Sequence, residues 1–288
     1  MAFVQRLRRV AGALAVLGAA LLAARIPADL KAAAVPRAVY ISAVNPTGEF
    51  VTDLTPADIV VKKNGQLCEV IGLDPATDPF HAAIVVDDGG NGHMQLPVAE
   101  LLNAGAGHGL FSINMLNPQS IRLNDFSTSA DVLQRSVARL IERGRVPRDL
   151  DVLADAVSAA ARDLEKRKLA RPVIVVLTNG GEAADREVAR AILDELRTSG
   201  AALHLVHVVA AELGMVLVEG PPQSGGSSTP ATSTRGFADA TAAIARTLAH
   251  QYKLTWSEPA GAGSGDRLQV TATRPGVKVI APTRVPSR

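Results

Sequence analysis

Between residues 80 and 213 the chain alternates short apolar runs with longer amphipathic stretches, and this alternation restricts the possible folds most strongly. The runs at 81–86 (HAAIVV) and 172–178 (PVIVVLT) are rich in β-branched residues and show no polar alternation. Such runs are typical of strands buried on both faces of a parallel sheet. Parallel strands need long crossovers, which the amphipathic stretches can supply as helices. The sequence therefore predicts a doubly wound α/β domain, with a mostly parallel sheet flanked by helices and right-handed crossovers.

The expected elements follow from the same periodicity. We expect strands at 81–86, 109–116, 121–123, 172–178 and 201–209, and helices at 95–103, 129–143, 150–168, 186–199 and 237–250. The stretch at 220–235 is low in complexity, with many Gly, Ser, Thr and Pro residues. Such composition is typical of linkers, so this stretch is predicted to be a flexible loop.

Two further segments, 35–78 and 251–288, have the pattern of β structure on either side of the α/β region. In the first, Asn64-Gly65 stands between apolar runs and is a strong signal for a two-residue hairpin. Each segment holds too few strands to be stable alone. We therefore expect the two segments to pack together as a small β domain beside the α/β domain at 79–250.

The first 34 residues have the composition of a targeting segment. Arg6, Arg8 and Arg9 precede an uncharged run at 10–24. That length suits the apolar core of a signal peptide and is short for a membrane span of about 20 residues. We expect either a signal peptide or an uncleaved N-terminal anchor, in which case 10–24 would be a membrane tether. Both alternatives predict an exported protein that is periplasmic or extracellular.

Composition narrows the classes of partner. Without residues 1–34 the chain holds 25 basic and 27 acidic residues, so its formal charge changes from +2 to −2. No basic stripe then remains that would point to nucleic acid. Aromatic residues make up only 3%, which disfavours stacking surfaces for single-stranded nucleic acid. The single cysteine, Cys68, excludes an intrachain disulfide and is expected to be a small buried apolar residue.

Polar residues directly follow two of the predicted strands. Acidic residues and glycines follow the run at 81–86, and Asn-Gly-Gly follows the run at 172–178. The carboxyl ends of strands are where open α/β sheets bind their ligands. We therefore predict that a protein partner contacts these two loops. The residues concerned are Asp88, Gly89, Gly90, Asn91, Asn179 and Gly180.

Four phrases in the sequence carry a resemblance to a known family. They are GEFVTDLTPADIVVKKNGQ at 48–66, VIVVLTNGGE at 173–182, HQYKLTW at 250–256 and RPGVKV at 274–279. In this order they resemble the bacterial von Willebrand factor A-like (VWFA) family, and more narrowly the exported VWFA-related group first described for acidobacterial proteins. The resemblance extends from about residue 37 to residue 284.

The resemblance also implies a metal site. In that family the first core strand ends in Asp-x-Ser-x-Ser. A later Thr and Asp complete a site for a divalent cation, usually Mg²⁺, which leaves a position for an acidic group of the partner. Carried over one position at a time, these five positions fall on Asp87, Gly89, Asn91, Asp151 and Asn179. Only the first keeps its usual residue, so the resemblance implies a degenerate site, and we expect no metal or other cofactor.

A recast oxygen site is the alternative. Asp87, Asn91 and Asp151 could supply oxygen ligands, which hard cations such as Mg²⁺ prefer, and Asp88 could join them. Asn179 offers a neutral oxygen in place of a carboxylate. Without a cation, clustered carboxylates would repel one another. In a degenerate site these acids and amides would instead be solvated or would cap helix N-termini.

Searches for catalytic motifs find none in the sequence, which lacks G-x-S-x-G, a Walker A loop and H-E-x-x-H. His93 and His108 are predicted to lie in loops near the ligand-binding edge of the sheet, but no serine nucleophile accompanies them. His204 and His207 stand three apart on a predicted strand, so they face opposite sides of the sheet and do not share a metal.

These observations predict an exported, non-enzymatic protein-interaction module for adhesion or scaffolding. It would bind a protein partner through the strand-end loops, without the usual metal. Two alternatives remain open. One is a metal-dependent binding protein or hydrolase-like enzyme that uses the recast oxygen site. The other is a structural envelope protein without ligand binding.

Overall fold

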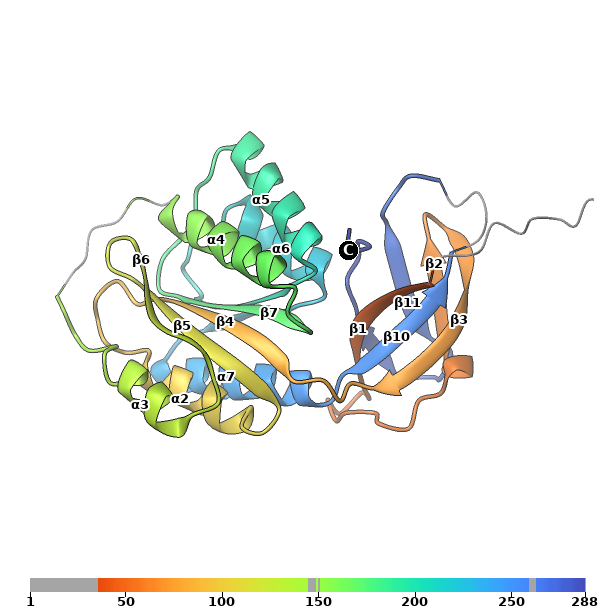
Figure 1. Cartoon of the computed structure of the whole chain (residues 1–288), viewed down its shortest axis with the longest axis horizontal. Helices are drawn as coiled ribbons and strands as arrows, with labels where there is room; N and C mark the ends of the chain where they lie inside the picture. The colour runs from red at the N-terminus through yellow and green to blue at the C-terminus, as the bar shows by residue number, and fades with distance from the viewer. Residues whose placement is uncertain (1–35, 145–148, 150, 259–262, 288) are drawn as a thin grey trace, which may run out of the picture. The chain divides into compact units, whose positions relative to one another are not determined.

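The computed structural model describes residues 36–144, 149, 151–258 and 263–287, and in that part the chain forms two six-stranded sheets (Figure 1). One sheet is antiparallel and the other is mostly parallel. The predicted signal peptide or anchor at 1–34 lies outside the described residues. None of the helices described is both long and apolar enough to cross a bilayer.

The mostly parallel sheet has the strand order β6-β5-β4-β7-β8-β9. Its strands are β4 (Phe80–Asp87), β5 (Gly109–Leu116), β6 (Ser120–Ser127), β7 (Pro172–Thr178), β8 (Ala202–Val208) and β9 (Ser228–Ala231). All neighbours are parallel except β5 and β6, which form an antiparallel hairpin at one edge. Counted from β4, this is the order 3-2-1-4-5-6 of doubly wound folds, so the predicted fold class is confirmed.

Helices cover both faces of this sheet (Figure 1). One face carries α2 (Gln95–Ala104), α3 (Ala130–Val137) and α7 (Thr234–Ala249), and the other carries α4 (Val152–Arg167), α5 (Arg186–Ser199) and α6 (Met215–Ser224). Successive residues of β4 serve the two layers in turn, with Ile84 and Val86 in the first core and Ala83 and Val85 in the second. Because both faces are buried, the strand has no polar alternation.

The antiparallel sheet is built from both ends of the described chain, in the order β11-β2-β3-β10-β1-β12. Its strands are β1 (Pro36–Val44), β2 (Ile59–Lys63), β3 (Gln66–Pro75), β10 (Tyr252–Ser257), β11 (Leu268–Ala272) and β12 (Lys278–Ile280). A short 3-10 helix, η1 (Pro56–Asp58), precedes β2. The hairpin between β2 and β3 turns at Asn64-Gly65, where both residues have positive φ as a type I′ turn requires. Cys68 lies buried in the core of this sheet, as predicted.

Three of the four phrases that carry the family resemblance contact one another in this sheet. Arg274 Nη1 lies 2.7 Å from Asp53 Oδ1. The Tyr252 hydroxyl donates a hydrogen bond to the Val51 carbonyl at 2.9 Å and accepts one from Leu54 N–H at 3.2 Å. The segments around residues 53, 252 and 274 therefore form one junction, although they are far apart in the sequence.

Two predicted elements differ in extent from the observed ones. The helix expected at 129–143 ends at Val137, although Leu140 remains fully buried, so the apolar pattern continues beyond the helix. The brief strand expected at 121–123 is the longer β6, which pairs antiparallel with β5. An edge strand has one unpaired side and a mixed burial pattern, and its periodicity in the sequence is correspondingly weak.

The low-complexity stretch at 220–235 is not a flexible loop. It contains the end of α6, all of β9 and the start of α7. Its small residues allow close packing: a Cβ on Gly226 would lie 1.8 Å from the Leu203 carbonyl oxygen, and one on Gly220 would lie 2.7 Å from Leu203 Cδ2. The composition typical of a mobile linker therefore reflects the close approach of α6 and β9 to β8.

Candidate functional site

The doubly wound sheet has its switch point between β4 and β7. The chain leaves β4 toward β5 on one side and leaves β7 toward β8 on the other, so the two strand-end loops diverge. The strand register places Asp87 directly beside Thr178 at the carboxyl ends. In open α/β sheets the ligand crevice lies at this position.

Asp87 is buried, and its carboxylate is engaged by the neighbouring strand. Thr178 Oγ1 donates a hydrogen bond to Asp87 Oδ2 at 2.6 Å, and Asn179 N–H donates to the Asp87 carbonyl at 3.0 Å. Thr178 Oγ1 also accepts a hydrogen bond from Gly180 N–H at 2.9 Å. The ends of β4 and β7 are therefore joined through a carboxylate–hydroxyl pair.

Asp88 is fully buried and braces the β4–α2 loop from inside. Its Oδ1 accepts from Gly90 N–H at 2.8 Å and from Arg143 Nη2 at 3.0 Å, and its Oδ2 accepts from Gly92 N–H at 3.0 Å. A guanidinium and two backbone N–H groups neutralise and satisfy this carboxylate. The prediction that Asp88 contacts a partner is wrong, because its side chain has no exposed surface.

The segment that carries Arg143 lies against the same loop. Arg143 N–H donates to the Gly90 carbonyl at 2.8 Å, and Arg143 Nη1 donates to the Ile141 carbonyl at 3.0 Å. Gly92 has φ +71°, and a Cβ there would lie 2.5 Å from the backbone nitrogen of Glu142. The loop therefore needs glycine at this position, both for its backbone conformation and for the close approach of the covering segment.

The remaining predicted contact residues divide by exposure. Asn91 is exposed, and Gly89, Asn179 and Gly180 are half-buried, whereas Gly90 is buried. Asn179 Nδ2 donates to the carbonyl oxygen of the buried acid Asp88 at 3.2 Å, so this amide also holds the two loops together. The accessible part of the predicted surface consists of amide groups and glycine backbone.

Asp151 lies apart from the strand-end bonds. It is exposed and is the residue before the first turn of α4. Within the described ranges, no hydrogen bond joins its side chain to Asp87 or Asn91. The structure therefore brings Asp87 and Asn179 together, and it leaves Asn91 and Asp151 at the surface.

The divalent cation implied by the family resemblance does not fit this donor set. One oxygen of Asp87 accepts from a hydroxyl, Asp88 is already neutralised by Arg143, and Gly89 offers no side-chain oxygen. A guanidinium 3.0 Å from the second carboxylate adds positive charge beside the place a cation would need. Among the residues that the structure describes, no three His, Cys, Asp or Glu side chains are grouped to hold a metal ion.

The histidines do not form a site at this edge. His93 is exposed in the β4–α2 loop, but His108 immediately precedes β5, and its carbonyl accepts from Phe80 N–H at 3.0 Å. The prediction for His108 is wrong, because a loop that enters a parallel strand lies at the opposite edge from the loops that leave it. His204 Nδ1 lies 3.0 Å from Ser227 Oγ, and His207 Nδ1 lies 2.8 Å from the Val208 carbonyl.

The sequence did not indicate three residues near the strand ends, namely Thr178, Arg143 and Glu182. Glu182 is 2% exposed; its Oε1 accepts from Ala184 N–H at 2.9 Å, and a Cβ on Gly214, the residue before α6, would lie 2.4 Å from its Oε2. A helix N-terminus favours negative charge, which helps to explain a carboxylate buried there. Of these three residues, only Thr178 could have been found from the sequence. Aligning the carboxyl ends of the strands predicted at 81–86 and 172–178 places it beside Asp87.

Comparison with known proteins gives structural likenesses only. No family model and no curated protein matches the sequence. Among solved structures, the chain is similar to the SpRpn10 VWA domain, with 13% identity, a TM-score of 0.43, and coverage of 56% of this chain and 93% of that one. It is also similar to a von Willebrand factor type A protein from Catenulispora acidiphila, with 10% identity, a TM-score of 0.46, and coverage of 88% and 75%.

A third similar structure is an aerotolerance-related membrane protein from Bacteroides fragilis, with 13% identity, a TM-score of 0.41, and coverage of 59% of this chain and 98% of that one. Two of the three names state a von Willebrand factor A domain, the family that the sequence phrases resemble. At such identities these likenesses concern the fold class and carry no information about ligands.

Replacing Arg143 by methionine is expected to lower the free energy of unfolding by about 3 kcal/mol, because it leaves Asp88 buried without its cation. The loss should be measured by urea denaturation, with and without Mn²⁺. We expect Mn²⁺ to raise the denaturation midpoint of the variant and not that of the wild type, since the Asp88 carboxylate then lacks the positive charge of Arg143. Arg139→Met, at an exposed position in the same segment, is the control. A wild-type protein stabilised by Mn²⁺ to the same extent would contradict this explanation.

Proposed function

We propose that this chain is an exported, non-enzymatic protein-interaction module that binds a protein partner through the loops after β4 and β7, without a metal ion. The observation that carries the proposal is the internal bracing of the β4–α2 loop. Asp88 holds the loop from inside through Arg143 and two backbone N–H groups, while Asn91 remains exposed. The N-terminal targeting composition supports export.

A braced loop suits recognition of a partner. A loop held by hydrogen bonds in the free protein loses little conformational entropy on binding, so more of the contact energy appears as affinity. The exposed groups are an asparagine side chain and the backbone around Gly89 and Gly180, which can donate and accept hydrogen bonds. Neutral polar recognition of this kind needs no cation to bridge the partner.

The bonding of the strand-end carboxylates favours this proposal over a hydrolase-like enzyme. A catalytic acid, base or nucleophile must reach the reacting atom of a substrate. Asp87 is buried against Thr178, and Asp88 is buried against Arg143. Both carboxylates therefore stabilise the loops, and the exposed Asn91 has no titratable group.

The proposal can be tested with a photo-crosslinking amino acid placed at Asn91. We expect a discrete crosslinked protein from an extract of exported proteins, identified by mass spectrometry, and we expect the same product when chelator is added. The matched control is the same amino acid at Ala106, which is exposed in the α2–β5 connection at the opposite edge of the sheet. Identical products from both positions, or loss of the Asn91 product with chelator, would argue against recognition by this loop without a metal.

A further inference from the structure

A polar groove of about 360 Å³ lies between α5 and α6, and four arginines and three acids line it. The arginines are Arg186, Arg190, Arg197 and Arg284, and the acids are Asp194, Glu219 and Asp266. Arg186, Arg190, Arg197 and Asp194 belong to α5, and Glu219 belongs to α6. With four arginines and three acids, the groove has a formal charge of +1.

The three acids of the groove are already engaged. Asp266 lies 2.8 Å from Arg284 Nη1 and 3.6 Å from Arg197 Nε, and Asp194 lies 3.2 Å from Arg197 Nη2. Glu219, the acid on α6, accepts a hydrogen bond from the Gln223 side chain at 2.8 Å. The two aspartates neutralise Arg197 and Arg284, whereas Glu219 keeps its negative charge, so the net positive charge of the groove comes from the two remaining arginines of α5.

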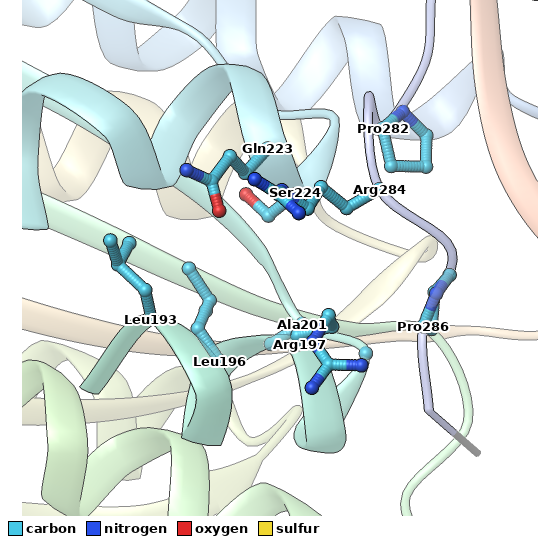
Figure 2. A pocket seen from close by; sticks show the side chains of 10 residues that line it. Leu193, Leu196, Arg197, Ala201, Gln223, Ser224, Pro282, Arg284 and Pro286 are labelled. Carbon is cyan, nitrogen blue, oxygen red and sulfur yellow. The ribbon is translucent and has the colours of Figure 1, made fainter. Parts of the chain in front are cut away.

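The C-terminal segment lines the groove through Arg284, and Figure 2 shows the neighbouring pocket, which shares Arg197, Gln223 and Arg284 with the groove. Arg284 N–H donates to the Gln223 carbonyl at 3.3 Å, and Ser287 N–H donates to the Arg197 carbonyl at 3.2 Å. Figure 2 shows the Arg284 side chain extending from this segment toward Gln223 and Ser224 in α6. The paired arginines thus belong to the attachment of the C-terminal segment.

Arg186 and Arg190 differ from the two paired arginines of the groove. Both are exposed, and neither has an ion pair or a side-chain hydrogen bond within the described residues. They lie one turn apart on α5, where like charges repel. Arg186 is also the first residue of the helix, where the helix dipole disfavours a cation. A bound anion would relieve both unfavourable interactions.

The groove adjoins the proposed partner-binding loops. The loop that holds Asn179 and Gly180 leads from β7 into α5, so the first turn of α5 lies at the same edge of the sheet as these residues. Arg186 is at that end of the groove. A partner bound to the strand-end loops can therefore continue along α5.

We propose that the groove binds an acidic segment of the protein partner, whose Asp or Glu carboxylates pair with Arg186 and Arg190. This inference rests on the proposed function, because it supplies the chemistry of the partner. The planar guanidinium group matches a carboxylate with two parallel hydrogen bonds. Along the helix, residues 186 and 197 are separated by about 16 Å, a length that about five residues of extended peptide span.

The test is fluorescence anisotropy of labelled hexaglutamate with the full chain at low ionic strength. We expect the double substitution Arg186→Gln with Arg190→Gln to weaken binding at least about tenfold, and added salt to weaken wild-type binding, since exposed charges are screened. The matched control is Arg135→Gln with Arg246→Gln, which removes two exposed arginines on α3 and α7. This control should leave the affinity unchanged.

Equal weakening by the two double variants would show unspecific attraction and overturn the proposal, as would the absence of any hexaglutamate binding. Inorganic phosphate is a further probe: binding of phosphate without binding of hexaglutamate would make the groove a small-anion site and also overturn the proposal. The test is separate from that of the proposed function. If hexaglutamate binds at the groove but Asn91 gives no specific crosslink, the groove still binds acidic peptide and the proposed interface at the strand-end loops is refuted.

Discussion

Replacement of Arg171 by methionine is expected to lower the free energy of unfolding by about 3–5 kcal/mol. The substitution removes a buried guanidinium and leaves its buried hydrogen-bond acceptors without a donor. Arg171 is only 4% exposed, and burial lowers the pKa of its guanidinium. Its partners are the carbonyl oxygens of Ala76, Asp78 and Leu248 and the side-chain oxygen of Gln251. Urea denaturation of the full chain measures the loss.

The position of these acceptors explains the size of the effect. Ala76 and Asp78 belong to the connection from β3 to β4, Leu248 is in the last turn of α7, and Gln251 is in the connection from α7 to β10. The guanidinium also lies 5.2 Å from the ring centre of Tyr40 in β1. One side chain therefore joins both connections between the antiparallel sheet and the doubly wound sheet.

Two comparisons make the Arg171 prediction specific. Arg167→Met removes a side chain of similar size from exposed ion pairs with Asp125 and Asp163, and it should cost less than about 1 kcal/mol. Arg171→Lys keeps the charge, but an ammonium has fewer donors in a different geometry, so it should restore only part of the stability. An Arg171→Met variant as stable as Arg167→Met would refute the role given to this residue.

Acidification is expected to destabilise the protein by about 3 kcal/mol between pH 6.5 and pH 4 through His204 alone. His204 lies buried in β8, and desolvation lowers its pKa from 6.5 to about 4. Between these values the unfolded chain binds a proton that the folded protein does not. This contribution to stability is therefore complete above pH 6.5 and is lost as the pH falls toward 4. Denaturation midpoints across that range measure it.

The contribution of His204 to the pH dependence of stability is obtained by comparing the wild type with a variant that lacks this histidine. His204→Asn should flatten the pH dependence between 6.5 and 4, whatever its effect on stability at neutral pH. His93→Gln removes an exposed histidine and is the matched control. If the His204→Asn and wild-type curves run parallel over that range, titration of this residue does not account for the acid sensitivity.

The sequence predicted the fold well where local pattern and burial agree. The run at 172–178 is β7 with the predicted limits, because every residue of this strand is buried. The hairpin at Asn64-Gly65 is likewise a local signal, since positive φ at both positions selects these residue types. Prediction failed at 220–235, where glycine and proline serve contacts with β8 that only the folded chain creates.

The sequence predicted where the candidate site lies, but it did not predict the hydrogen bonds and ion pairs of its side chains. Acids at the end of an apolar run located the switch point correctly, because sheet topology brings strand ends together. The orientation of Asp88 toward the protein interior depends on Arg143, which is 55 residues away in the sequence. A long-range ion pair of this kind has no local signal, so a residue that looked available to a partner is an internal support.

The antiparallel sheet sets an order for folding during synthesis. Pro75 in β3 pairs with Tyr252 in β10, although the whole doubly wound sheet lies between them in the chain. At about 5–20 residues per second, roughly 10–35 s pass before β10 emerges to join the earlier strands. All strands of the doubly wound sheet are complete by then, so that sheet can form first. Strands β1 and β3 meanwhile keep open edges, which can pair with strands of other chains and so favour aggregation.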